Sequence, residues 1–287
     1  MTPRLLTALA VVAVASAHAT PPVALRQGDG SAHDKRQTNF TVVVLGSSTA
    51  AGAGANPRSM GWVDRYKFYL QHVGPTNQVI NRAVGGYTTY NVMPTGTVLP
   101  AKRPSPDPKC NITYAISLKP SVIILSLPTN DAANDYGMDE TTANFKTIAA
   151  AARAARIPLW VTTPQPRNLP LDRRGKLAQL RDSINATFGA NALDFWSGLG
   201  KADSTLLPMF DSGDGTHLNN VGHAFLFQRV VAANIPEIVC AHTLPFHAGN
   251  RAPNRIRLAS STPVHPITRK GGRVAPASSP PPHIKLR

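Results

Sequence analysis

The chain has 287 residues, with 30 Lys and Arg against 15 Asp and Glu and a formal net charge of +15. Most of this excess lies at the carboxyl end: residues 241–287 hold eight basic and no acidic residues, whereas residues 20–240 hold 21 basic against 15 acidic. The composition therefore excludes a uniformly basic domain, and the length of the central part fits one domain with a full hydrophobic core.

The first 19 residues have the three parts of a secretory signal peptide in the correct order. Arg4 supplies the positive charge, an apolar run extends from Leu5 to Ala15, and Ala17-His18-Ala19 fits an A-x-A cleavage site. The apolar run is too short to span a bilayer, and we expect no transmembrane segment later in the chain. We therefore expect an exported protein with a flexible leader over residues 20–37; a buried N-terminal helix is the alternative.

Short apolar runs alternate with amphipathic segments through the predicted domain, residues 38–240. Strands are predicted at residues 40–45, 78–81, 121–127, 158–162 and 192–195, and helices at 62–73, 141–155, 173–188 and 219–234, the last ending before Pro236. Alternating strands and helices indicate the α/β class: a three-layer α/β/α architecture around a central, mostly parallel, five-stranded sheet.

One segment of the predicted domain has no helical or strand periodicity. Residues 95–111 are rich in Pro, Lys and Arg. Long loops inside compact domains are often functional, so this insertion is a candidate for substrate contact.

Export would permit a disulfide between the two cysteines, Cys110 and Cys240, although both could equally be buried thiols. Asn39, Asn111 and Asn185 begin N-glycosylation sequons, which matter only in a source that glycosylates. No Cys/His cluster has the spacing of a metal site, and we expect no metal and no cofactor.

Residues 241–287 are predicted to form a disordered, basic, Pro-rich tail. The segment contains Gly271-Gly272 and Pro280-Pro281-Pro282 and has no apolar periodicity, so it cannot bury enough surface to offset the entropy of ordering. The tail either contacts an acidic polymer or surface, or is a solvated end without a partner.

In open parallel sheets ligands bind beyond the carboxyl ends of the strands, and two of these loops carry suitable groups. Small residues surround Ser48 after the first strand and leave its hydroxyl exposed on a sharp turn, as a nucleophile requires. A helix N-cap is the alternative for Ser48. After the second strand, Gly85-Gly86 brings a backbone N–H close to any group above the sheet, unless it is a plain turn.

Two further loops add an amide and an acid–base pair. Asn130, after the third strand, could donate its side-chain amide or could cap the following helix. Asp214 and His217 lie three residues apart before the last helix, so Asp214 could accept from one imidazole nitrogen and leave the other free to take a serine proton. A lone loop histidine is more commonly a surface residue, and His223 is interpreted as a packing residue.

The order Ser, Gly, Asn and Asp-x-x-His resembles that of the SGNH hydrolases, also called the GDSL family, over residues 40–235. The resemblance implies a flavodoxin-like fold and a serine esterase. It implies a catalytic triad of Ser48, Asp214 and His217, and an oxyanion hole made by the Ser48 and Gly86 N–H groups and the Asn130 amide.

Two positions depart from the family pattern. Ser47 stands where the family usually has Asp, and Pro128 stands where it usually has Gly two residues before Asn130. Neither change removes a reacting group. The first alters the electrostatics beside the nucleophile, and the second stiffens the loop that carries Asn130, so both bear on rate and substrate preference.

Family members act on acetylated sugars, short acyl esters, lysophospholipids and thioesters. Candidate substrate-binding residues, which could instead only hold loops together, are Arg103 in the insertion and Gln165, Arg167 and Asn168 after the fourth strand. No long apolar lid is apparent, which favours short acyl groups such as acetyl on a polar or glycan carrier. The alternatives are a lysophospholipase or lipid esterase, and a non-catalytic glycan-binding module on the same fold.

Overall fold

A five-stranded, all-parallel sheet forms the centre of the computed structural model, which describes residues 39–127 and 129–243. Its strands are β1 (Thr41–Gly46), β2 (Gln78–Asn81), β3 (Val122–Ser126), β4 (Leu159–Thr162) and β5 (Ala192–Leu193). They lie in the order β2-β1-β3-β4-β5, with every neighbouring pair parallel. The predicted α/β fold is confirmed, and the strand order reverses beside β1, where such sheets place a binding crevice.

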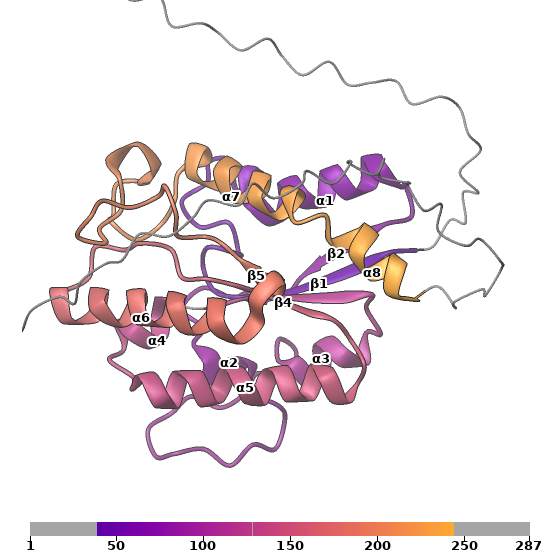
Figure 1. Cartoon of the computed structure of the whole chain (residues 1–287), viewed down its shortest axis with the longest axis horizontal. Helices are drawn as coiled ribbons and strands as arrows, with labels where there is room; N and C mark the ends of the chain where they lie inside the picture. The colour runs from indigo at the N-terminus through magenta and orange to yellow at the C-terminus, as the bar shows by residue number, and fades with distance from the viewer. Residues whose placement is uncertain (1–38, 128, 244–287) are drawn as a thin grey trace, which may run out of the picture. The chain divides into compact units, whose positions relative to one another are not determined.

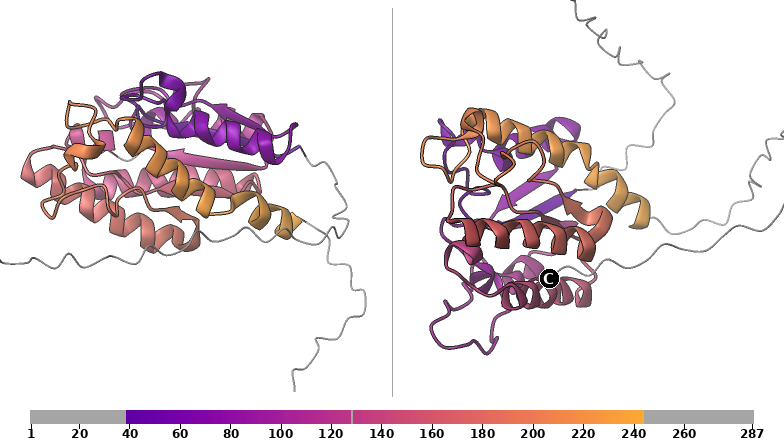
Figure 2. Two further views of the ribbon diagram at one scale, coloured as in Figure 1. Left: turned by 90° about the horizontal axis from the view of Figure 1, so that it is seen from above. Right: turned by 60° about the vertical axis from the view of Figure 1, so that its left-hand side comes forward.

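Helices cover both faces of the sheet (Figure 1). The longer ones are α1 (Trp62–Val73), α5 (Met138–Ala154), α6 (Leu171–Phe188), α7 (Asn220–Ala232) and α8 (Ile235–Thr243). The shorter ones are α2 (Thr89–Val92), α3 (Ile112–Ser117) and α4 (Thr129–Ala133), with 3-10 turns η1 (Arg58–Met60), η2 (Gly189–Asn191) and η3 (Pro208–Phe210). Figure 2 shows α1 and α7 lying side by side on one face.

The continuous apolar run of β1 fits its place inside the sheet, between β2 and β3. Val42 and Val44 pack into the cluster formed with α1, α7 and α8, whereas Val43 and Leu45 pack into the cluster formed with α2, α3, α5 and α6. All four side chains are fully buried, because alternate residues of a strand point to opposite faces and both faces are covered. The alternating side chains of β1 thus anchor the helices on both faces of the sheet, and Ser48 follows the carboxyl end of this strand.

The carboxyl end of the domain differs from the sequence expectation. The predicted last helix does end before Pro236, as α7, but the chain turns at Asn234, which has φ of 48°, and continues into α8, which was not predicted. Proline is tolerated in the first turn of a helix because its missing N–H has no intrahelical partner there. The predicted boundary at residue 240 lies inside α8, and the rest of the predicted tail, the leader and the signal peptide lie outside the described residues.

Within residues 39–127 and 129–243, one stretch, Asn220–Ala241, is long and apolar enough to cross a membrane by length and composition alone, whereas the sequence was expected to hold no later transmembrane segment. It consists of the two helices α7 and α8, interrupted at Asn234. Leu226, Val230 and Ile235 are fully buried in the cluster shared with α1. Packing onto the sheet therefore accounts for the apolar character of its inner face.

The cysteines and the N-glycosylation sequons, which would matter in an exported protein, lie within the described residues. Cys110 and Cys240 both belong to the described residues, and no disulfide joins them. Asn111 is fully buried as the N-cap of α3: its side chain accepts from the Tyr114 N–H and donates to the Thr95 hydroxyl. A glycan at Asn111 is incompatible with this packing, whereas Asn39 and Asn185 are exposed.

Candidate active site

The loops predicted to carry chemistry follow the carboxyl ends of the strands, on the left in Figure 1. Ser48 comes directly after β1 and is partly exposed, while its neighbour Ser47 is buried. The turn is closed by the Ala51 N–H donating to the Ser47 carbonyl and the Ala53 N–H donating to the Ser48 carbonyl, each at 2.9 Å. The small residues of this segment permit so tight a turn, and the Ser48 hydroxyl remains at its surface.

The loop after β2 lies beside Ser48. A Cβ atom placed on Gly85 would be 4.0 Å from the Ser48 Cβ. Gly86 is exposed and has φ of 83°, a conformation that a residue with a side chain rarely adopts. Gly85 therefore lies next to Ser48, and Gly86 is the next residue of the same loop.

Asp214 and His217 form a hydrogen-bonded pair in the loop before α7. The His217 Nδ1 lies 2.6 Å from the Asp214 Oδ2, and the backbone N–H of His217 donates to Asp214 Oδ1 at 2.8 Å. Although desolvation by burial raises the pKa of Asp214, the backbone and ring hydrogen bonds from His217 lower it to about 2. The carboxylate is ionised near neutral pH, so it favours a proton on Nδ1 and leaves Nε2 as an acceptor.

The Asn130 side chain is buried and its orientation is determined by two partners. Its Nδ2 donates to the Tyr87 carbonyl at 2.9 Å, in the loop after β2, and its Oδ1 accepts from Arg167 Nη1 at 3.1 Å. One N–H of the amide is thereby used, and the described residues provide no acceptor for the other. Asn130 has one donor left for a bound group.

Gln165 joins the loop of Ser48 to the loop of His217. The Thr49 hydroxyl donates to Gln165 Oε1 at 2.9 Å, and Gln165 Nε2 donates to the Thr216 carbonyl at 2.8 Å. Thr49 and Thr216 are the immediate neighbours of Ser48 and His217. Because Gln165 is buried and makes both bonds, it holds together the two segments expected to supply nucleophile and base.

Gly54 allows these two segments to approach each other. A Cβ atom at position 54 would lie 2.3 Å from the Leu218 carbonyl oxygen and 2.9 Å from the His217 Cβ. The Asn220 side chain also bonds to both the N–H and the carbonyl of Asn56. The segment that follows Ser48 is thus packed directly against His217 and the residues that follow it.

Gly54→Ala is expected to lower kcat about ten- to hundredfold, because the new methyl group must displace the backbone beside His217. Gly96→Ala is the matched control: Gly96 has φ of 84° against 86° for Gly54, but a Cβ there meets nothing within 4 Å. Both variants carry the strain of a positive φ, about 1–2 kcal/mol. Equal ester hydrolysis by the two variants would contradict this role of Gly54.

His223, interpreted from the sequence as a packing residue, is fully buried behind the Ser48 loop. Its Nε2 lies 2.9 Å from the Ala53 carbonyl, and its Nδ1 accepts from the Trp62 N–H at 3.3 Å. Both bonds need the neutral ring protonated at Nε2. Desolvation by burial lowers the pKa of His223 below its usual 6.5.

We expect this histidine to destabilise the fold on acidification. The unfolded chain takes up the His223 proton as pH falls through 6.5, whereas the folded chain does not, so the contribution is present above that pH and lost below it. Burial raises the pKa of Asp131 to about 6, which acts in the opposite direction. The measurement is therefore the Tm of the parent and of His223→Gln at pH 7.5 and at pH 5.5. On going to pH 5.5, the Tm of the variant should rise relative to the Tm of the parent.

Of the predicted substrate-binding residues, Arg103 lies apart from the other three. Arg103 lies outside this cluster of loops: its guanidinium pairs with Glu140 and lies 4.1 Å from the centroid of the Tyr136 ring. The bond from Arg103 holds the pKa of Glu140 at about 2. Arg103 therefore attaches the insertion, residues 95–111, to α5. Of the two roles left open by the sequence, substrate contact and the holding of loops, this contact fits the second.

Asn168 and Arg167 lie in the cluster but are engaged with protein groups. Asn168 donates its N–H to the Gly215 carbonyl and accepts from the Leu206 N–H, so it supports the loop that carries Asp214. Arg167 reaches both Asn130 and Thr216. The sequence offered the holding of loops as an alternative role for Gln165 without naming its partners, and the role of Gly54 was not predicted, since only the three-dimensional approach of the two loops reveals it.

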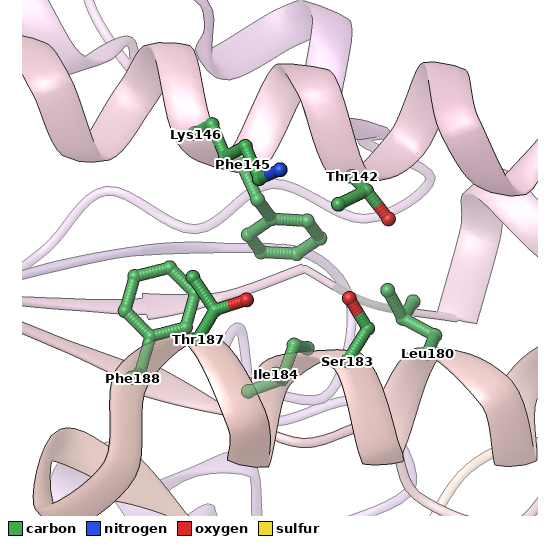
Figure 3. Close-up of a pocket in the computed structure, with 8 residues that line it drawn as sticks. All are labelled: Thr142, Phe145, Lys146, Leu180, Ser183, Ile184, Thr187 and Phe188. Carbon is green, nitrogen blue, oxygen red and sulfur yellow. The ribbon is translucent and has the colours of Figure 1, made fainter.

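Other features of the described chain do not compete with this site. Among residues 39–127 and 129–243 no group of three His, Cys, Asp or Glu side chains could hold a metal ion. Figure 3 shows a small pocket between α5 and α6, lined by Phe145, Ile184 and Phe188 among others. None of the predicted catalytic residues lines it.

Residues 44–225 match the sequence model of a family described as GDSL-like lipase/acylhydrolase. A candidate acylhydrolase from Bacteroides fragilis is similar in structure, with 21% identity, 72% of this chain and 90% of that chain covered, and a TM-score of 0.51. A candidate lipolytic protein of the G-D-S-L family from Desulfitobacterium hafniense is also similar in structure. It has 16% identity and a TM-score of 0.53, with 68% of this chain and 99% of that chain covered. At these identities the structural likeness shows the fold alone, and a comparison with curated proteins found no match.

Proposed function

Because the chain belongs to the GDSL-like lipase/acylhydrolase family, whose members hydrolyse esters, we propose that it does so through an acyl-enzyme on Ser48. The observation that carries the proposal is the Asp214–His217 pair, at 2.6 Å, in a loop held against the Ser48 loop by Gln165. It supports the proposal because a serine nucleophile needs an imidazole base nearby, itself oriented by a carboxylate.

The reaction proceeds in two halves. His217 Nε2 takes the Ser48 proton while Oγ attacks the ester carbonyl, and Asp214 stabilises the imidazolium that forms. The imidazolium then protonates the leaving alcohol as the C–O bond breaks, which leaves the acyl group on Ser48. Water, deprotonated by the same His217, attacks the acyl-enzyme and releases the acid and the free serine.

Three donors would stabilise the oxyanion that develops in each half. They are the backbone N–H groups of Ser48 and Gly86 and the second N–H of the Asn130 amide. The support is that Gly85-Gly86 lies beside Ser48 and that Asn130 is bonded to Tyr87, the residue after Gly86. Donors fixed before the reaction need no reorganisation when charge appears, which is where their catalytic value lies.

The proposed substrate is a short acyl ester, such as acetyl, on a polar or glycan carrier. Polar side chains support the loop of Asp214 and His217: Gln165 and Arg167 both bond to Thr216, the residue before His217. Such a surface favours a carrier rich in hydroxyl groups over a long alkyl chain, whose burial requires apolar walls. A lysophospholipid is the competing substrate class.

A substrate panel tests the proposal. Parent and Ser48→Ala protein would be compared on an acetylated oligosaccharide, a short aryl ester and a lysophospholipid, with release of acid as the readout. We expect hydrolysis of the first two by the parent only. Hydrolysis of the lysophospholipid alone would replace the proposed substrate class, and no hydrolysis of any ester with retained glycan binding would indicate a non-catalytic module.

We also propose that the protein is secreted after removal of residues 1–19, on the order of the charged, apolar and A-x-A regions. Mass spectrometry of the exported protein should find Thr20 at the N-terminus. Contact of the basic tail with an acidic polymer is tested by comparing the mature chain with one ending at Thr243, the last residue of α8. Unchanged hydrolysis with lost polymer binding would assign that contact to the tail.

A further inference from the structure

The Arg167 guanidinium lies between Asn130 and the loop that carries His217. Its Nη1 donates to the Asn130 side-chain carbonyl at 3.1 Å, and its Nε donates to the Thr216 hydroxyl at 3.3 Å. Arg167 follows β4, Asn130 follows β3, and Thr216 precedes His217 in the loop before α7. One partly buried side chain thus contacts both the predicted oxyanion donor and the loop of the predicted base.

We propose that Arg167 is a positioning residue that orients and polarises the Asn130 amide for the oxyanion, an inference that rests on the proposed function. The sequence left Arg167 open as a substrate contact or a residue that holds loops together, and two of its donors are directed at protein groups. Its effect on the reaction then passes through Asn130 rather than through direct contact with the ester.

The choice of partners determines which way the amide faces. Guanidinium can only donate, so it selects the Oδ1 side of Asn130, and the Tyr87 carbonyl can only accept, so it selects the Nδ2 side. A flipped amide would set donor against donor and acceptor against acceptor. The remaining N–H of Nδ2 is therefore held in one direction before any substrate binds.

The charge of Arg167 adds to this orientation. A cation on the amide oxygen draws electron density from the nitrogen, so the free N–H becomes a stronger donor, as in other chained hydrogen bonds. The bond to the Thr216 hydroxyl ties the amide to the residue before His217. Desolvation by burial lowers the pKa of Arg167 while the nearby Asp214 raises it, but arginine remains charged near neutral pH.

A double-mutant cycle tests the inference with p-nitrophenyl acetate as the probe. Arg167→Met keeps most of the side-chain length and removes every donor. We expect it to lower kcat about tenfold or more, with KM within about twofold, when Asn130 is present. In the Asn130→Ala background the same substitution should change kcat by less than about twofold, because the amide through which it acts is gone.

Arg173→Met is the matched control. Arg173 is also a partly buried arginine, and its Nη1 donates to the Ala133 carbonyl at the end of α4, the helix that carries Asn130. Loss of this bond loosens α4 without touching the Asn130 side chain. We expect kcat within about threefold of the parent, and Tm of both arginine variants is measured to compare their folding.

Three results for Arg167→Met would overturn the inference: kcat equal to that of the parent, an increase in KM with kcat unchanged, or an equal loss of kcat in both backgrounds. A loss of kcat in Arg173→Met as large as in Arg167→Met would overturn it as well. Failure of the proposed function is seen separately. In that case the parent does not hydrolyse the probe, or Ser48→Ala hydrolyses it as fast as the parent does.

Discussion

Ser48→Ala is expected to lower kcat for ester hydrolysis by on the order of ten-thousandfold or more, while Ser47→Ala stays within about threefold of the parent. The alanine variant has no oxygen to attack the carbonyl, and any residual rate comes from the oxyanion donors alone. The neighbouring serine is a natural control, since Ser47 is buried and Ser48 is partly exposed.

The same experiment can be extended to the proposed base. His217→Ala should lose about as much activity as Ser48→Ala, and the double variant should be little worse than either, because the two groups act as one unit. Single-turnover mixing with p-nitrophenyl acetate would detect acylation directly. Burst-phase release of nitrophenol by Ser48→Ala, or a large loss in Ser47→Ala, would move the nucleophile to another residue.

Asn130→Ala is expected to lower kcat about a hundred- to thousandfold with a small change in KM. The amide is needed most when negative charge develops on the oxygen, so its loss raises the barrier more than it weakens substrate binding. Asn130→Asp should be at least as impaired, because a carboxylate keeps the shape but has no N–H and places a like charge beside the oxyanion.

The control for Asn130 is Asn134→Ala. Asn134 is exposed in the turn directly after α4, and its side chain donates to the Asn130 backbone carbonyl. Steady-state kinetics of the two variants should separate loss of the amide from loosening of the backbone. If both variants lose kcat equally, or if Asn130→Ala raises KM alone, the assignment of the Asn130 amide to the oxyanion hole is wrong.

The sheet could be predicted because its signals are local. The buried strands β1, β3 and β4 read as short continuous apolar runs, and the stripe of Trp62, Tyr66 and Leu70 gave α1. Loops at the ends of such strands meet at one edge by topology. The residues proposed for chemistry were therefore found from their places in the chain order.

The braces of the site could not be predicted in the same way. Gln165 bonds to residues 116 and 51 positions away, and Arg167 bonds to residues 37 and 49 positions away. A long polar side chain has many partners open to it, and only the packed fold selects among them. The extension by α8 was missed because Pro236 was interpreted as a stop, whereas it lies in a first turn.

Covalent labelling with a small fluorophosphonate, mapped by peptide mass spectrometry, tests most directly whether the serine hydroxyl and the imidazole act on each other. We predict a single adduct on Ser48 in the parent and in Ser47→Ala. In His217→Ala the labelling rate should be at least about a hundredfold lower, because the base that activates the hydroxyl is absent. An adduct on another residue, or labelling of His217→Ala at the parent rate, would contradict the proposed pairing of Ser48 with His217.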